Sequence, residues 1–344
     1  MAPAQRLPGI DALKGLACVL IVWHHLAFYG PMSDVVHSAA PWLINWLYDY
    51  GRMAVQVFFV VSGFLAAAAL EPAATAALSG QAWRLVLRRY RRLAVPLMAA
   101  VGVAVVVAAA VRPWLPHPSV PGPPEMLQIL SHLFFLQDVM GQEALSAGIW
   151  YVAIDFQLFV ISVALFTLVP GRWRIAVVLS LAAASLWLFN RHAALDMSGL
   201  YFFGSYALGI LAWWASRSRR PTRWLLLIAG LGALGLAMDF RGRLVVAMAV
   251  AMGLVWAQRS PGPTCWLQQH WLLRLGQVSY SVFLIHFPVC LLVNAAVTHF
   301  WPAQLAANVI GMLLAFALSL LAGDAFYRCI ESRSARWQRV WKSP

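Results

Sequence analysis

Long apolar stretches constrain this chain more than any other feature of its sequence. A helix needs roughly 17–25 mostly apolar residues to cross the hydrocarbon core of a bilayer, and stretches of that length recur from end to end. Hydrophobic residues make up 62% of the sequence and charged residues only 11%. A soluble domain carries about 25% charged residues, so too few are present here to cover a water-facing surface. The stretches are too long, and too uniformly apolar, for barrel strands.

We therefore predict an all-α fold, a polytopic transmembrane helical bundle of about ten spans. The expected spans cover about residues 10–29, 53–71, 93–111, 148–169, 174–190, 199–216, 224–240, 243–258, 276–299 and 304–327. A single membrane domain is expected over residues 1–344, with its core at 6–332 and no appended extracytoplasmic domain. The first apolar run continues into His24 without a small-residue cleavage pattern, which indicates a span rather than a signal peptide.

Lys and Arg residues are distributed unevenly between alternate loops. If the N-terminus is cytoplasmic and all ten spans cross, 20 of the 25 basic residues face the cytoplasm and 5 face the outside. This bias predicts a cytoplasmic N-terminus and a cytoplasmic C-terminus. The net charge of +13 sits in short clusters between apolar runs, which argues against nucleic acid as a partner. The cysteines show no metal-binding or redox spacing, and no metal site is expected; they are Cys18, Cys265, Cys290 and Cys329.

Ionisable residues inside spans are costly and usually face the bundle interior or a wet cavity, so they indicate function. In the first span, Lys14 and His25 differ by only about 20° around the helix and lie roughly 16 Å apart along its axis. Asp11 is about 40° from His25 on the same helix. The face thus joins a cation at the cytoplasmic end to an imidazole near the outer end. Alternatively, Lys14 is an interfacial anchor and His25 a hydrogen-bonded core histidine.

A carboxylate in the fourth span is predicted at a similar depth. Asp155 lies roughly 10 Å from the outer end of its span, and His25 lies roughly 6 Å from the outer end of its own. A carboxylate beside an imidazole would orient it and raise its basicity. Asp155 as a structural hydrogen-bonding residue is the alternative. His286, near the middle of its span, fits a site or a structural role equally well, and Ser62 is interpreted as a helix-packing residue.

A run of arginines lies at the cytoplasmic entrance of the third span, before Pro96. Its members are Arg88, Arg89, Arg91 and Arg92. Arginine forks match phosphate oxygens, so the run is a candidate phosphate clamp. A topology determinant that contacts anionic lipid is the alternative. Together with Lys14, the run suits a ligand with a phosphorylated head and a long neutral arm, such as coenzyme A, although ATP and lipid phosphate fit the run too.

The longest predicted outer loop covers about residues 112–147 and carries six prolines before Met126. Proline resists regular structure, and long loops in compact domains often act as lids. The loop is therefore a candidate cover for a site, with a solvated connector as the alternative. A short apolar segment within it, residues 126–136, is expected to lie in the membrane interface or to re-enter the membrane.

Six motifs in order along the chain resemble those of the acyltransferase-3 family of integral membrane acyltransferases. They are the opening segment 7–17 with His25 at its spacing from Lys14, the Phe-Phe-x-x-Ser-Gly-Phe of 58–64, the arginine run ending at Pro96, the segments 150–159 and 275–286, and Ile330-Glu331. Three positions depart from the family pattern. Lys14 replaces an arginine and cannot make its bidentate fork. Asp155 replaces a glutamate, and Arg333 replaces a proline.

The resemblance implies acyl transfer, by default acetyl transfer, from cytoplasmic acyl-CoA to an extracytoplasmic glycan or lipid-linked carbohydrate, in the bacterial inner membrane. His25 would act as general base or as a transient acyl carrier. The other implied roles are orientation of His25 for Asp155, donor binding for Lys14, Arg88, Arg89, Arg91 and Arg92, substrate binding for Trp150, Tyr151 and His286, and structural or uncertain roles for Asp11, Ser62 and Glu331. No permanently bound cofactor is expected. The rival functions are a transporter or exporter of a glycan or acyl group without catalysis, and a structural partner with a dead site.

Overall fold

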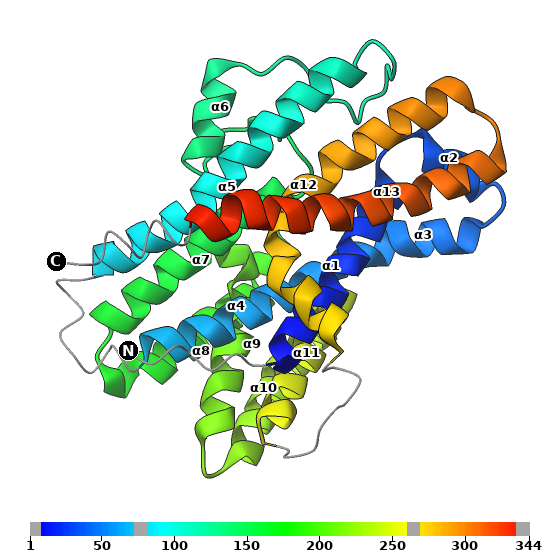
Figure 1. Cartoon of the computed structure of the whole chain (residues 1–344). Helices are drawn as coiled ribbons and strands as arrows, with labels where there is room; N and C mark the ends of the chain where they lie inside the picture. Colours follow the sequence, from blue (N-terminus) through cyan, green and yellow to red (C-terminus); the bar gives the residue numbers. More distant parts are fainter. Residues whose placement is uncertain (1–7, 72–81, 260–268, 335–344) are drawn as a thin grey trace. The chain divides into compact units, whose positions relative to one another are not determined.

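The computed structural model describes residues 8–71, 82–259 and 269–334, and within these ranges the chain is helical with no strands. Figure 1 shows the helices coloured along the sequence. This confirms the all-α polytopic bundle expected from the apolar stretches. Arg6, Leu7, Cys265 and the basic residues that follow Ser334 were part of the sequence predictions but lie outside the described residues.

Every predicted span coincides with a long helix. The long helices are α1 (Pro8–Phe28), α4 (Val55–Leu70), α5 (Ala82–Val111), α7 (Ile149–Leu168), α8 (Gly171–Trp187), α9 (Gly199–Arg217), α10 (Pro221–Met238), α11 (Gly242–Arg259), α12 (His270–Phe300) and α13 (Leu305–Phe326). Shorter helices are α2 (Pro31–His37), α3 (Pro41–Tyr50) and α6 (Met126–Leu133). A π-helical turn, Tyr327–Glu331, continues α13.

Eight helical segments in the described ranges are long and apolar enough to cross a membrane, and α9 and α11 are not among them. Helix α9 contacts α4, α8, α10 and α11, and nearly all of its residues are buried. A helix surrounded by protein does not need lipid-facing apolar side chains. Its sequence can therefore include Gly, Ser, Tyr and Trp, which lower its hydropathy without exposing polar groups to lipid.

The described chain forms two compact units, each assembled from separate stretches of sequence. The first unit falls within Met1–Leu13, Val55–Tyr90 and Tyr151–His270, and the second within Lys14–Ala54, Arg91–Trp150 and Trp271–Pro344. Both units are interleaved along the chain, so neither corresponds to one continuous half of the sequence. The single domain expected over residues 1–344 stays a prediction.

In the first unit, α4 and α9 approach each other closely at two glycines. A Cβ on Gly63 would lie 1.9 Å from the carbonyl oxygen of Tyr206, and a Cβ on Gly209 would lie 1.9 Å from that of Val60. Small residues allow helix backbones to come together in this way. The glycine of the Phe-Phe-x-x-Ser-Gly-Phe segment is therefore a packing residue, next to Ser62.

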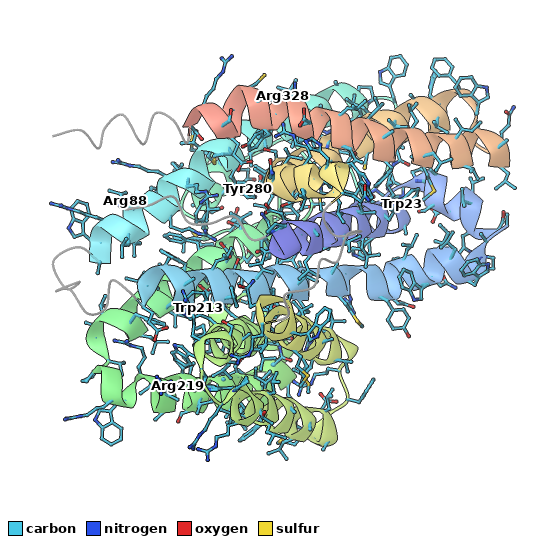
Figure 2. The ribbon with its side chains drawn as sticks, turned by 60° about the horizontal axis from the view of Figure 1, so that its bottom comes forward. Trp23, Arg88, Trp213, Arg219, Tyr280 and Arg328 are labelled. Carbon is cyan, nitrogen blue, oxygen red and sulfur yellow. The ribbon has the colours of Figure 1, made fainter. Side chains whose placement is uncertain are left out.

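In the second unit, α1 is held against α12 and α13. A Cβ on Gly15 would lie 2.8 Å from the carbonyl oxygen of Leu272, so α1 and α12 are close at this point. Trp23, labelled on α1 in Figure 2, stacks on Phe316 of α13 with ring centroids 5.0 Å apart. Tyr280 of α12 donates a hydrogen bond to the carbonyl oxygen of Leu93 in α5. These contacts position the polar side chains of α1 and α12.

The apolar segment inside the proline-rich loop forms α6, a helix of only eight residues. It is too short to span a bilayer, because a span needs roughly 17–25 residues. A capping box between Glu125 and Gln128 fixes its N-terminus. The side chains of Met126, Leu127 and Leu130 are exposed, which leaves α6 with an apolar outer face.

Candidate active site

Two buried histidines from α1 and α12 meet in the second unit. His25 is 8% exposed and His286 is 0% exposed. The Nδ1 atom of His25 lies 2.6 Å from the Nε2 atom of His286. The two rings are nearly parallel, with an interplanar angle of 10° and centroids 4.8 Å apart. Between two imidazole nitrogens, this geometry is a hydrogen bond from one ring to the other.

The surrounding carbonyl groups assign the protons of the pair. Nδ1 of His286 lies 2.8 Å from the carbonyl oxygen of Phe283 and 3.2 Å from that of Val282. A carbonyl oxygen only accepts, so Nδ1 of His286 carries the hydrogen and its Nε2 carries the lone pair. Nδ1 of His25 then donates to that lone pair. His25 is left with a lone pair on Nε2, which is the atom a general base uses.

The end of the proline-rich loop lies against His25. A Cβ on Gly148 would lie 2.8 Å from Cζ of Phe283 and 3.4 Å from Cε1 of His25. Gly148 also has a φ of 81°, a conformation that side chains with a Cβ rarely adopt. Glycine at this position therefore lets the backbone approach the imidazole between its two nitrogens.

The adjacent histidine, His24, has a different environment. Its Nδ1 donates to the carbonyl oxygen of Leu47, 2.9 Å away in α3. A Cβ on Gly51 would lie 2.8 Å from the Cβ of His24, so the backbone after α3 packs on this side chain. His24 therefore fixes α3 to α1. Because it is a buried histidine with a structural contact, its substitution is a suitable control for substitution of His25.

Charged residues gather near the other end of α1, around Glu331. The hydroxyl of Ser281 in α12 donates to Oε2 of Glu331 at 2.6 Å. Lys14 and Arg92 both act electrostatically on this carboxylate. Glu331 lies in the π-helical turn Tyr327–Glu331, and such turns are frequent at functional sites. Two of the cations predicted to bind a phosphorylated donor are thus both close enough to this carboxylate to act on it electrostatically.

In the first unit, Asp155 of α7 forms a buried ion pair with Arg89 of α5. Nη2 of Arg89 lies 2.5 Å from Oδ2 of Asp155, which is 3% exposed. The guanidinium also lies over the ring of Phe159. Two buried atoms of the pair, Nε of Arg89 and Oδ1 of Asp155, have no hydrogen-bond partner among the described residues. Each retains the capacity to bind a polar group.

The four arginines of the run on α5 have different environments. Arg88, Arg91 and Arg92 are exposed, whereas Arg89 turns toward Asp155. Arg88 is labelled on α5 in Figure 2. The hydrogen-bond partner of Asp155 is thus an arginine, and the partner of Nδ1 of His25 is His286. The orienting action that the sequence assigned to Asp155 stays a prediction.

A family model described as an acyltransferase domain, of the acyltransferase-3 type, matches residues 7–328. The chain belongs to the acyltransferase-3 family. The match covers nearly the whole chain and confirms the family expected from the six motifs. No curated protein and no solved structure matches the chain. Membership makes this protein a membrane acyltransferase, which requires an acyl donor and an acceptor as substrates.

The remaining predicted residues of this acyltransferase have aromatic or polar surroundings. Tyr151 packs on the rings of Phe58 and Phe59 and lies within hydrogen-bonding reach of the Ser62 hydroxyl. Ser62 therefore supports Tyr151 in addition to lying in a packed helix. Trp150 and Asp11 are partly buried, and their predicted roles stay predictions. In the described ranges, no group of three or more His, Cys, Asp or Glu side chains is arranged to hold a metal ion.

Proposed function

We propose that this acyltransferase transfers an acetyl group from cytoplasmic acetyl-CoA to a hydroxyl of an extracytoplasmic glycan or lipid-linked carbohydrate, in the bacterial inner membrane. The observation that carries the proposal is the buried pair of His25 and His286. It supplies an oriented base inside helices of membrane-spanning length, in a chain of an acyltransferase family. The acetyl group, the coenzyme A donor and the carbohydrate acceptor are parts of this proposal.

His25 acts as the general base in the proposed reaction. Its Nε2 accepts the proton of the acceptor hydroxyl while the hydroxyl oxygen attacks the thioester carbonyl. A C–O bond forms and the C–S bond breaks. The thiolate of coenzyme A then takes the proton from Nε2. Attack by Nε2 on the thioester would instead use the same lone pair to form an acyl-histidine, with cleavage of the C–S bond and release of the thiolate. The acceptor hydroxyl would then take the acyl group from Nε2 and give its proton to the thiolate.

His286 holds His25 ready for this step. Because Nε2 of His286 accepts from Nδ1 of His25, the lone pair of His25 is kept on the atom that faces away from the pair. Because Nδ1 of His286 donates to carbonyls of its own helix, His286 cannot turn without losing those bonds. The pair therefore fixes both the tautomer and the ring plane of the base.

Lys14 and Arg92 bind the phosphates of the donor in this proposal. Lys14 lies roughly 16 Å from His25 along α1, a distance that a long neutral arm can bridge. The exposed Arg88 and Arg91 add positive charge on the same helix as Arg92. Glu331 sets the net charge of the cluster, because it is the carboxylate on which Lys14 and Arg92 act.

Reconstituted protein tests the proposal directly. Purified protein in liposomes is supplied with radiolabelled acetyl-CoA and an envelope glycan fraction, and both free coenzyme A and labelled glycan are measured. His25→Ala is expected to abolish both products, whereas His24→Ala, the adjacent buried histidine, retains them in folded protein. Wild-type transfer by folded His25→Ala would overturn the proposal. Glycan movement without acetyl-CoA turnover would favour the transporter, and no acetyl-CoA binding would favour the structural partner.

A further inference from the structure

A buried asparagine of α12 binds the corner that follows α1. Asn294 is 1% exposed. Its Oδ1 accepts a hydrogen bond from the backbone N–H of Met32 at 3.2 Å. Its Nδ2 donates to the carbonyl oxygen of Cys290 at 3.1 Å and to that of Tyr29 at 3.5 Å. One amide thus joins α12 to the chain on both sides of Gly30.

The corner is shaped around this amide. Gly30 has a φ of 101°, where only glycine is unstrained. A Cβ on Gly30 would lie 2.5 Å from Oδ1 of Asn294. The backbone therefore has no room for a side chain where it meets the amide, and the contact between the corner and α12 is tight.

The same corner is attached to His25. The backbone N–H of Tyr29 donates to the carbonyl oxygen of His25 at 2.9 Å. The Tyr29 ring lies edge-on to the His25 ring, with centroids 5.5 Å apart, and edge-on to the ring of Phe287, 5.0 Å away. Phe287 is the residue after His286. The side chain and backbone of Tyr29 thus connect the amide contact to His25 and to the residue that follows His286.

Helices α1 and α12 are parallel and held together on both sides of the histidine pair. On one side, Gly15 contacts Leu272 and Gly276. On the other, Asn294 binds the corner at Tyr29 and Met32, about 6 Å beyond His25 along α1. Because α1 ends at Phe28, the second contact determines how far its end can slide along α12.

We propose that Asn294 is a positioning residue for the proposed transfer reaction. Its amide sets the register of α1 against α12 that brings Nδ1 of His25 to Nε2 of His286. A hydrogen bond weakens steeply as its length and angle depart from ideal values, so a small slide of α1 breaks the pair. The expected effect on catalysis rests on the proposed function. The claim that Asn294 sets the register of α1 against α12 does not depend on it.

A second buried asparagine provides a matched control. Asn308 of α13 is 1% exposed, and its Nδ2 donates to the carbonyl oxygens of Trp301 and Gln304. It lies in the same unit, and its Nδ2 makes the same kind of bond, but these bonds stay within the segment that begins its own helix, and its Oδ1 has no partner among the described residues. Asn308→Leu therefore measures the cost of losing a buried amide without a change at α1.

The test compares Asn294→Leu and Asn308→Leu for thermal stability, for kcat and KM with acetyl-CoA, and for the proton shared by the two histidines. That proton is observed as a downfield resonance in protein with ring-¹⁵N histidine and is assigned by its loss in His286→Ala. Asn294→Leu is expected to lose the resonance and to lower kcat about 10²-fold at unchanged KM, the effect of a misplacement of about 1 Å. Asn308→Leu loses the two hydrogen bonds that Nδ2 donates, and it is expected to keep both the resonance and kcat.

Asn294→Ser keeps the test decisive if Asn294→Leu does not fold. A serine hydroxyl both donates and accepts but is shorter than the amide, so this variant is expected to lose only part of kcat and to show a shifted or weakened resonance. Equal losses of kcat in the Asn294 and Asn308 variants, or an unchanged resonance in folded Asn294→Leu or Asn294→Ser, would overturn the inference. Activity in His25→Ala would instead contradict the proposed function. The resonance in the Asn294 variants would still show whether Asn294 sets the register.

Discussion

Nδ1 of His25 donates a hydrogen bond to Nε2 of His286, a second neutral imidazole 2.6 Å away. The bond joins helices α1 and α12 at residues 261 positions apart in sequence. His286 was expected from the sequence to bind substrate, and the structure gives it a direct contact with the proposed base. This hydrogen bond fixes the tautomer of His25 and the orientation of its ring plane.

Removal of His286 is expected to impair transfer without preventing donor binding. His286→Ala leaves Nδ1 of His25 without its acceptor, so both tautomers of His25 become populated and the ring can rotate. We expect kcat to fall about 10²–10⁴-fold, the contribution typical of a positioned general base. Steady-state kinetics in liposomes measure the change, with His24→Ala as the matched control. Wild-type kcat in folded His286→Ala would contradict this role.

Arg89 and Asp155 are expected to contribute to the stability of the fold as a coupled pair, so the losses of stability on removing each one should not add. Removing one partner leaves a buried charge uncompensated, which is strongly destabilising. Arg89→Ala and Asp155→Ala should each lower the unfolding temperature, and the double variant should lower it by less than their sum. Thermal unfolding in detergent measures this cycle, with the exposed Arg88→Ala as control. Additive losses would show that the pair is not coupled.

The same variants separate the two roles considered for Asp155. If Asp155 only stabilises the first unit, transfer activity should follow the folded fraction in Asp155→Ala and in the double variant alike. Activity per folded molecule is measured after size-exclusion chromatography. Loss of kcat in well-folded Asp155→Asn would instead favour a direct role in the reaction.

Lys14 is expected to contribute to donor affinity through its charge. Lys14→Ala should raise the KM for acetyl-CoA roughly tenfold, about 1.4 kcal/mol, at unchanged kcat. Lys14 is partly buried, so the change should shrink only in part as salt is added. Lys14→Arg preserves the charge and should retain donor affinity. Glu331→Gln removes the opposing carboxylate and should lower the KM, and an increase in KM would contradict the proposed role of the cluster.

The proline-rich loop is expected to open in acid through His132, which is 0% exposed. Its Nδ1 donates to the carbonyl oxygen of Gln128, and its Nε2 accepts from the backbone N–H of Leu145. Burial lowers the pKa of His132 below its ordinary value of 6.5, against the opposing effect of the Gln128 hydrogen bond. The opened loop therefore binds a proton more readily than the closed loop, and His132 stabilises the closed loop least at low pH.

Hydrogen exchange along residues 136–145 measures this opening. In the wild-type protein, exchange should accelerate as the pH falls below about 6.5, after correction for the intrinsic rate. His132→Gln lacks the titrating ring and should remove the acceleration. His117→Gln, a histidine variant in the same loop, should keep it. An acceleration that persists in His132→Gln would assign the opening to another group.

The helices were predictable because span length and composition are local properties. Each long apolar stretch became a helix, and the cost of polar groups inside them drew attention to His25 and Asp155. The less apolar α9 was also found from its sequence, although its burial by neighbouring helices was not visible there. Gly63 was noted as part of a motif, and its role as a contact with Tyr206 depends on where α9 lies.

Contacts between distant segments could not be predicted from one sequence. Nothing local connects His25 to His286, and the structure joins them only because α1 and α12 lie side by side. The helical period places Arg89 about 100° from Arg88, but only the position of Asp155 determines which of them turns inward. The division into two units also depends on contacts between segments far apart in sequence.

The choice of an imidazole as the partner of His25 has an electrostatic consequence. A carboxylate there would place a permanent charge among apolar helices, where an unpaired ion is expensive. With two neutral rings, the resting site needs no counter-ion. In the proposed reaction, charge arises only when His25 takes a proton from the acceptor, and the apolar surroundings then favour transfer of that proton to the departing thiolate. The same burial that protects the base thus drives the proton forward.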